Sequence, residues 1–287
     1  MMVSEMASIM NCEQLIRQLK ASGYAVLADV IPSGAVPRVR DSDLETARQH
    51  AVRSNFAPQG TSQIASLIRY DQSFAEYLVE ERLTNIVTAL LGAHYRVSFT
   101  TALVNHPGND RGQWHADWPY IQSLGARFPA PYPDLIMHLT MLFMLSDFTV
   151  ETGATIALPG SHRRGTNPTA EPVADRLDPL PGELQITGKA GSALLLDSRC
   201  WHAAAPNRSA EDRVAVAVRF APWWLNLEVL RPNSFLRKQM VERANKPDAP
   251  APTIPPEVFA QLPENVQPLF HHWIDAPIRQ PQTLCRQ

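Results

Sequence analysis

The second half of the sequence constrains the fold most, because short β-rich runs alternate there with turn residues. These runs cover 95–105, 135–148, 154–158, 193–197 and 214–222. Several short strands separated by turn signals are typical of a β-sandwich or a β-barrel. A chain of 287 residues is long enough to bury a sizeable core around such strands.

Helical patterns come before this region. Asn11 and Gln14 can form a capping box for a helix over 12–22, and Gly23 can end that helix. The next residues, 24–31, predict a strand. With helices first and strands after, the predicted class is α+β.

Between these elements and the β-rich region, the sequence predicts one long helix over 73–92. Ser73 and Glu76 have the spacing of a capping box, an apolar stripe follows, and Gly92 can end the helix. Residues 33–70 are mixed and predict helix and loop.

The sequence predicts a single domain over 1–287. All-β folds of this length commonly form one unit. Residues 245–287 begin with a proline-rich connector and continue as a short helical tail. We expect this segment either to cover the active site or to pack at an interface.

The charge balance excludes two classes of partner. The chain has 26 Lys and Arg against 28 Asp and Glu, a net charge of −2, and no long basic run. Without a basic patch there is no electrostatic basis for binding nucleic acid or an acidic membrane surface. The apolar run at 135–145 is too short to span a bilayer and is interrupted by His138 and Thr140.

The cysteines and the first residues indicate a reducing compartment. Cys12, Cys200 and Cys285 are odd in number and far apart, which argues against a disulfide framework. The first residues lack the basic region of a secretory signal. We expect a cytoplasmic protein that is a monomer or a homodimer.

The segment "GQWHADWPY" at 112–120 is the first candidate site. On a strand, His115 and Asp117 point to the same face, so an imidazole and a carboxylate aim at one place. Taken alone, this pair fits a metal site and a hydrogen-bonded surface pair equally well.

A second polar cluster favours the metal site. His202 follows about 85 residues later, and two histidines with one carboxylate on a β framework match the ligand set of non-haem Fe(II) oxygenases. Arg213 has the planar fork that pairs with a carboxylate of an organic acid. Arg219 is the alternative, and an ordinary ion pair with Asp212 or Glu211 is the alternative role for Arg213.

Together these segments resemble the phytanoyl-CoA dioxygenase family of iron(II)- and 2-oxoglutarate-dependent oxygenases. The resemblance lies in "HADW" at 115–118, "LPGSHRRG" at 158–165 and "DSRCWHAAAPN…R" at 197–213. The opening "ASGYAVLADVIP" at 21–32 also fits. The likeness extends over roughly residues 12–225.

The resemblance implies that His115, Asp117 and His202 bind Fe(II). It implies that Arg213 holds the far carboxylate of 2-oxoglutarate and that O₂ is the co-substrate. The implied reaction oxidises an unactivated C–H bond of a small organic metabolite, in a setting such as natural-product biosynthesis. Hydroxylation is the first expectation, and desaturation and ring formation are open to the same chemistry.

The resemblance also implies the architecture, a double-stranded β-helix of the cupin-like jelly-roll type with flanking N-terminal helices. Relatives often carry Ser or Thr two residues after the arginine, where this chain has Ala215. We therefore expect Thr101 or Thr140 to supply that hydroxyl to 2-oxoglutarate.

Aromatic residues beside the motifs predict an apolar pocket for the substrate, since binding sites are largely apolar with a few polar anchors. Core packing is the alternative for each of these rings. The residues assigned to the pocket are Trp114, Trp118, Tyr120, Phe128 and Trp223.

Other polar residues leave competing interpretations open. His162 is expected to stabilise its turn, and His138 to be either a core histidine or a group behind the metal site. Cys200 is a soft ligand that would favour zinc, giving a zinc hydrolase or isomerase as an alternative function. The third possible function is that of a binding module with the same fold and no catalytic activity.

Overall fold

Ten short strands form two facing sheets in the computed structural model, which describes residues 11–50, 52–53, 60–118, 135–165, 167–168, 176–245 and 250–275. The strands are β1 Tyr24–Leu27, β2 Val52–Arg53, β3 Thr61–Ala65, β4 Arg96–Asn105, β5 Leu139–Met144, β6 Ile156–Ala157, β7 Leu184–Gln185, β8 Ala193–Asp197, β9 His202–Ala203 and β10 Arg213–Ala221.

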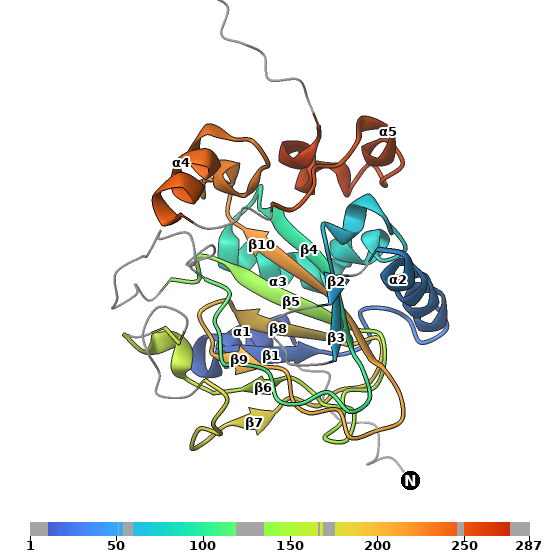
Figure 1. Cartoon of the computed structure of the whole chain (residues 1–287), viewed down its shortest axis with the longest axis vertical. Coiled ribbons are helices and arrows are strands. Elements are labelled where there is room, and N and C mark those ends of the chain that lie inside the picture. Colours follow the sequence, from blue (N-terminus) through green and yellow to red (C-terminus); the bar gives the residue numbers. More distant parts are fainter. Residues whose placement is uncertain are drawn as a thin grey trace, which may run out of the picture.

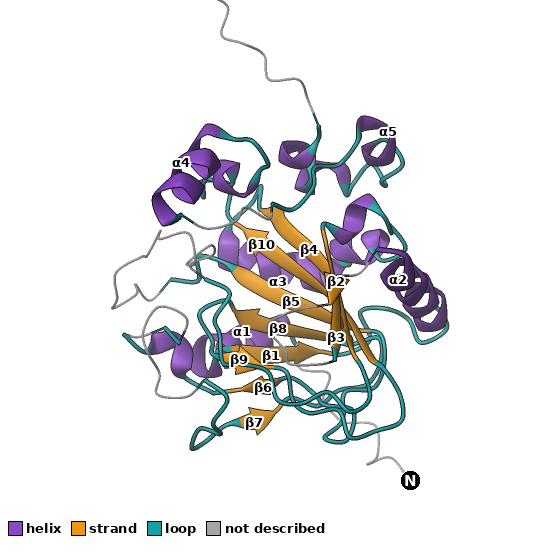
Figure 2. Cartoon of the chain, viewed as in Figure 1, coloured by secondary structure: helices purple, strands orange, loops and turns teal. Residues whose placement is uncertain are grey.

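The larger sheet has the order β1-β8-β5-β10-β4-β3-β2 and the smaller one the order β7-β6-β9 (Figure 1). The strand pairs in both sheets are antiparallel. This is the predicted double-stranded β-helix, with the smaller sheet facing the larger one (Figure 2).

Helices cover the outer face of the larger sheet (Figure 2). The α-helices are α1 Cys12–Ser22, α2 Val36–His50, α3 Glu81–Leu91, α4 Phe235–Ala244 and α5 Pro256–Phe259. Short 3₁₀ turns occupy Leu67–Arg69, Ala75–Val79, Ser161–Arg163, Glu228–Leu230, Gln267–Leu269 and His271–Trp273.

Strand β10 separates two cores because successive side chains point to opposite faces. Val214 and Val216 join the large core on the helix-covered side, together with buried residues of α1, α2 and α3. Ala215 and Ala217 join a second core between the two sheets. Arg213 shares the parity of these alanines, so β10 presents it to the space between the sheets.

The first helix agrees with its prediction. Asn11 accepts from the backbone N–H of Gln14, the Gln14 side chain accepts from the backbone N–H of Asn11, and Gly23 ends the helix in the left-handed region at φ 86°. The strand predicted over 24–31 is shorter, since β1 ends at Leu27.

The single helix predicted over 73–92 is wrong in its first half. Ser73 donates its backbone N–H and its hydroxyl to the Asp71 carboxylate, so it does not cap a helix. A 3₁₀ turn follows, and α3 begins only after Glu80, whose carboxylate accepts from the backbone N–H of Leu83. Asp71 is thus a competing acceptor that prevents the predicted capping box from forming.

Two strands were missed within 33–70. Strand β3 pairs with β4, with Ile64 opposite Ala102, and β2 pairs with β3. Ile64 is buried in the helix-side core. The polar composition of β3, TSQIA, hides the alternation that identifies a strand.

The described part of the tail packs on the helix-covered side of the larger sheet. Ile254 forms a β-bridge with Ile274, and Phe259 and Phe270 belong to the helix-side core. The indole N–H of Trp273 donates to the Val97 carbonyl of β4 at 2.9 Å. These contacts place 250–275 on the sheet face opposite the space between the sheets.

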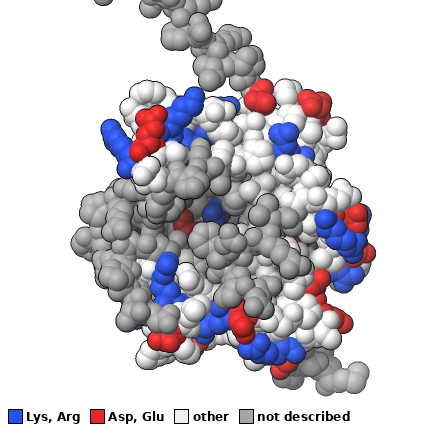
Figure 3. Space-filling view, viewed as in Figure 1, with Lys and Arg blue, Asp and Glu red and all other residues white. Residues whose placement is uncertain are grey.

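Among the described residues, no helix is both long and apolar enough to cross a membrane. On the face shown in Figure 3, acidic and basic side chains are interspersed around the rim. One acidic and one basic group lie deep in a recess near the centre of that face.

Asp43 on α2 is an unusual feature of the helix-covered side. It is 0% exposed, and neither carboxylate oxygen has a hydrogen-bond partner among the described residues. Burial, with a smaller contribution from the charge of Asp71, raises the pKa of Asp43 to about 8. Between about pH 4 and pH 8 the folded protein therefore keeps a proton on Asp43. In the unfolded chain the pKa of this carboxyl is about 3.9, so the proton is released there.

We expect this proton to make stability depend on pH. The free energy of unfolding should fall as pH rises from about 4 to about 8, by up to about 1.4 kcal/mol per pH unit, and then level off. Asp43→Asn, which cannot ionise, should remove this slope in urea unfolding measured across that range. The exposed Asp41→Asn is the control and should keep it. Equal pH dependence in all three proteins would contradict the assignment.

Candidate metal centre

Two segments far apart in the chain are joined by backbone hydrogen bonds. The His115 N–H donates to the His202 carbonyl at 3.0 Å, and the His202 N–H donates back to the His115 carbonyl at 2.9 Å. Two residues on, the Asp117 N–H donates to the Ser198 carbonyl at 2.7 Å. This antiparallel bridge brings the HADW motif beside β9.

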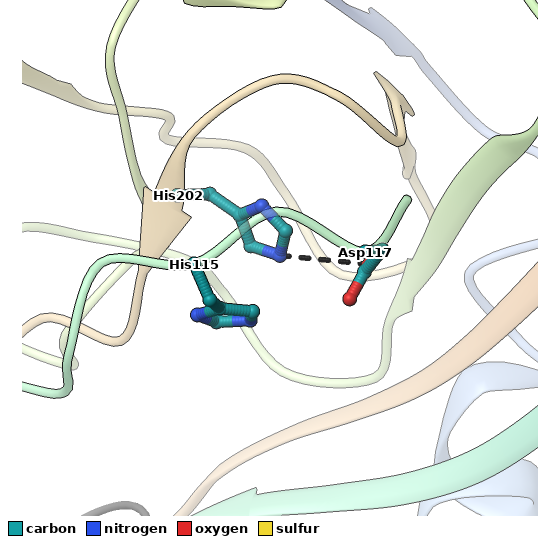
Figure 4. Close-up of side chains that lie close together, drawn as sticks. All are labelled: His115, Asp117 and His202. Carbon is teal, nitrogen blue, oxygen red and sulfur yellow. Dashed lines mark ion pairs between the residues drawn. The ribbon is translucent and has the colours of Figure 1, made fainter. Parts of the chain in front are cut away.

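The three side chains converge on one point (Figure 4). Their potential ligand atoms all lie within 4.8 Å of one another. His202 Nε2 is 3.6 Å from Asp117 Oδ2, and the imidazole ring centres of His115 and His202 are 4.2 Å apart. We call His115, Asp117 and His202 the triad.

Backbone carbonyls fix the tautomer of both histidines. His115 Nδ1 lies 3.0 Å from the Gln113 carbonyl, and His202 Nδ1 lies 2.9 Å from the Cys200 carbonyl. A carbonyl only accepts, so each Nδ1 carries a proton, and in the neutral ring the lone pair is on Nε2. Burial, followed by the neighbouring His202, lowers the pKa of His115 to about 4 and keeps it neutral. Neutral imidazoles with the other nitrogen tied to a carbonyl are the usual form of histidine ligands.

Asp117 is ionised and held at both oxygens. Burial alone would raise its pKa, but the Arg219 guanidinium and the two histidines outweigh burial and hold the pKa of this carboxyl well below its usual range. Arg219 donates to Oδ1 at 2.6 Å and the Thr140 hydroxyl donates to Oδ2 at 2.8 Å. Each oxygen retains a lone pair, because a carboxylate offers about four acceptor positions.

Arg213 is a buried cation without a carboxylate partner among the described residues. It is 4% exposed, its Nε lacks a hydrogen bond, and its guanidinium lies over the Phe148 ring at 4.7 Å. The adjacent Asp212 contacts His106 instead, at 2.8 Å, and His106 Nε2 lies 2.7 Å from the Ser62 hydroxyl. An uncompensated buried charge is costly, which fits a position that receives an anionic ligand.

The two threonines predicted to assist Arg213 have other partners. Thr140 donates to Asp117, and the Thr101 hydroxyl donates to the Ala102 carbonyl at 3.0 Å. Arg219, the alternative to Arg213 as partner for a carboxylate of the organic acid, forms an ion pair with Asp117. These contacts favour Arg213 among the two arginines, and the role of the threonines toward a ligand stays a prediction.

The aromatic residues assigned to the substrate pocket occupy different environments. Trp114 is fully buried in a small core beside the smaller sheet and donates its indole N–H to the Asp178 carbonyl. Trp118 is 4% exposed, and Trp223 is 63% exposed beside an open groove of about 310 Å³. Tyr120 and Phe128 lie outside the described residues. For Trp114 this position favours core packing.

Cys200 and His162 lie apart from the triad. The Cys200 thiol contacts the Leu158 carbonyl and the Ser161 hydroxyl, and burial raises its pKa to about 12. His162 Nε2 lies 3.1 Å from the Lys20 carbonyl, so it ties its turn to the end of α1. A neutral thiol outside the cluster gives no support to a zinc site that uses Cys200.

A jelly roll that carries two histidines and one carboxylate at one point defines a class, the non-haem metal oxygenases. The sequence model of phytanoyl-CoA dioxygenase (PhyH) matches residues 19–215. The chain belongs to the phytanoyl-CoA dioxygenase family.

Two relatives indicate how far this likeness extends. An uncharacterised protein of Mycobacterium tuberculosis is 25% identical over 227 residues, which cover 73% of this chain and 75% of that protein. The dioxygenase andF of Emericella variicolor is 34% identical over 138 residues, which cover 47% of this chain and 44% of that protein.

Solved structures share the fold. HygX from Streptomyces hygroscopicus, with nickel, 2-oxoglutarate and hygromycin B bound, has a TM-score of 0.60 and 19% identity over 74% of this chain and 88% of its own. SnoK, a non-haem α-ketoglutarate-dependent carbocyclase from nogalamycin biosynthesis, has a TM-score of 0.58 and 20% identity over 74% of this chain and 86% of its own.

The donor set leads to a test of metal binding. We expect the protein to bind one Co(II) ion per chain, detected by visible absorption and calorimetry. His115→Ala and His202→Ala should each weaken binding by more than about 100-fold, since outer partners of ligands alone cost about 10- to 100-fold. His94→Asn, at an exposed position with φ 63°, is the control. Unchanged affinity in both alanine variants would exclude the triad as the site.

Proposed function

We propose that this protein is an Fe(II)- and 2-oxoglutarate-dependent oxygenase that oxidises a C–H bond of a small organic metabolite. One observation carries the proposal. Two imidazoles, each with Nδ1 on a backbone carbonyl, and one ionised carboxylate converge within 4.8 Å, while Arg213 is a buried cation without a carboxylate partner among the described residues.

The donor set fits iron better than the alternatives. The two histidine nitrogens and the Asp117 oxygen would hold the metal and leave room beside it for an organic acid and O₂. The carboxylate at 117 completes this set, and Cys200 lies outside the cluster. When bound, iron and 2-oxoglutarate supply the oxidising power that no side chain provides, with O₂ as the oxidant.

Each residue of the site has a task in this proposal. His115, His202 and Asp117 would hold the metal. Arg213 would pair with the far carboxylate of 2-oxoglutarate through its fork of N–H donors, as planar guanidinium groups do. Phe148, under the guanidinium, keeps this arginine in place.

The residues between the sheets would keep bulk water away from the reaction. The core there is apolar and includes Leu142 from β5, Leu194 from β8 and Ala215 from β10. An apolar, closed surrounding strengthens the charged contacts within it and leaves the placement of one C–H bond to decide the product.

Substrate and product are the finer parts of the proposal. Named relatives and structural neighbours include a fungal dioxygenase, a carbocyclase and an enzyme that holds hygromycin B. These favour a natural product or a similar small metabolite as substrate. We propose hydroxylation as the reaction, with desaturation and ring formation as the outcomes that a product analysis separates.

A spectroscopic experiment tests the cofactors directly. Anaerobic addition of Fe(II) and 2-oxoglutarate should give a weak visible charge-transfer band. Arg213→Leu should weaken 2-oxoglutarate binding about 10- to 100-fold in a titration of this band, because a hydrogen-bonded charge pair contributes about 1.5–3 kcal/mol. Arg208→Leu removes an exposed arginine and is the control. Absence of the band with metal bound would refute the proposed cofactors.

A turnover assay tests the reaction. Incubation with Fe(II), 2-oxoglutarate, O₂ and a metabolite panel should release succinate only with a true substrate, and His202→Ala should abolish the release. Mass spectrometry of the product then distinguishes a gain of one oxygen atom from a loss of two hydrogens. Succinate release by His202→Ala at the rate of the unmodified protein would contradict the proposed role of the triad.

A further inference from the structure

A line of buried polar groups leads from β4 to the carboxylate of the triad. Ser98 Oγ lies 2.7 Å from His138 Nε2, and His138 Nδ1 lies 2.8 Å from Ser198 Oγ. Ser198 Oγ lies 2.8 Å from Thr140 Oγ1, which lies 2.8 Å from Asp117 Oδ2. Each of the first four residues is at most 2% exposed. We call Ser98, His138, Ser198 and Thr140 the relay.

The strand geometry explains how these residues meet. The register of β10 against β4 shifts between Arg219 and Phe220. Arg219 pairs with Phe99 and Phe220 pairs with Val97, so Ser98 is the additional residue of a β-bulge. Such a bulge re-aims a side chain, and here it brings the Ser98 hydroxyl to His138.

The other members of the relay come from strand ends. Thr140 is the second residue of β5, and His138 lies two residues before it, so both side chains share one face. Ser198 directly follows β8, which pairs with β5. The relay is therefore held by hydrogen-bonded strands of the larger sheet.

The protons of the relay have one consistent order. Asp117 is ionised and only accepts, so Thr140 donates its proton to Oδ2. The oxygen of Thr140 then accepts from Ser198, and the oxygen of Ser198 accepts from His138 Nδ1–H. A neutral His138 has its lone pair on Nε2, which accepts from Ser98, so the Ser98 hydroxyl gives its one proton to the ring at 2.7 Å rather than to the Arg219 carbonyl at 3.1 Å.

The opposite tautomer breaks this order. If the His138 proton were on Nε2, Ser198 would donate to Nδ1. Thr140 and Ser198 would then face each other at 2.8 Å with no proton between their oxygens. Burial, with Arg219 as a further cause, lowers the pKa of His138 to about 3, so the ring is neutral and carries one N–H.

We infer that His138 is a positioning residue for the metal-binding carboxylate, acting through Ser198 and Thr140 with its proton on Nδ1. The Nδ1–H of His138 donates to the Ser198 oxygen, so Ser198 donates its own proton to the Thr140 oxygen. Thr140 therefore donates its proton to Asp117 Oδ2. Arg219 holds Oδ1 from the other side at 2.6 Å. The carboxylate plane is thus fixed at both oxygens before a metal binds. This inference rests on the proposed metal-binding role of the triad.

The tautomer is tested in the full-length protein without metal. Protonated and unprotonated ring nitrogens differ widely in ¹⁵N chemical shift, and His138→Gln assigns the signals of His138 by their loss. We expect Nδ1 to be protonated and Nε2 to be unprotonated at neutral pH. A proton on Nε2, or on both nitrogens, would overturn the inference.

Two substitutions separate the two ring nitrogens in a Co(II) titration. His138→Asn keeps an N–H donor near the position of Nδ1, while His138→Gln places its amide near Nε2. We expect His138→Gln and Thr140→Val each to weaken Co(II) about 10-fold or more, as loss of outer partners does, and His138→Asn to stay within about threefold of the original. In the Asn variant the Ser98 hydroxyl can turn its proton to the Arg219 carbonyl, which lies 3.1 Å away.

The double variant and a control distinguish positioning from general damage. Because either single change already interrupts the relay, His138→Gln with Thr140→Val should weaken Co(II) little more than one change alone. His162→Gln, at another buried histidine, should leave Co(II) affinity unchanged. Additive losses in the double variant, or equal losses in His138→Asn and His138→Gln, would overturn the inference.

Failure of the proposed function looks different from failure of this inference. A protein without 2-oxoglutarate turnover that still shows the tautomer and the pattern of Co(II) affinities refutes the proposed reaction alone. A protein that is active, but binds Co(II) equally well with and without His138, refutes the positioning role alone.

Discussion

The bridge between His115 and His202 is the contact on which the site depends. Two backbone hydrogen bonds join positions that are 87 residues apart, and the Asp117 N–H adds a third to Ser198. The spacing of the three triad side chains is therefore set by strand pairing rather than by side-chain packing. Hydrogen bonds in a buried ladder are costly to break, so this pairing fixes the distance between the two segments.

Chemistry and stability are divided between the two faces of the larger sheet. The space between the sheets receives Arg213 and Arg219 from β10, and Thr140 from β5, while the helix-covered face receives the valines of β10. Asp117 is ionised between Arg219 and Thr140, whereas Asp43 on the other side is buried, has no hydrogen-bond partner among the described residues and keeps its proton. The same group thus has opposite charge states because its surroundings differ.

The sequence was sufficient to predict elements that depend on a local hydrogen bond or on a regular pattern of apolar residues. The capping box at Asn11, the strand over 193–197 and the class of fold follow from such patterns. It was insufficient where a residue outside the recognised pattern determines the hydrogen bonds. Asp71 takes the donors of Ser73, and a register shift that no local signal reveals selects Ser98 as a partner of His138.

The alternation along β10 has a consequence for engineering. Residues of even number, such as Val216, pack in the core on the helix-covered side, while those of odd number, such as Ala215, face the space between the sheets. A library that varies only the odd-numbered or only the even-numbered residues of β10 changes one face of the strand and not the other, since neighbouring side chains are on opposite sides of the backbone. Robustness and selectivity can accordingly be evolved as separate traits along a single strand.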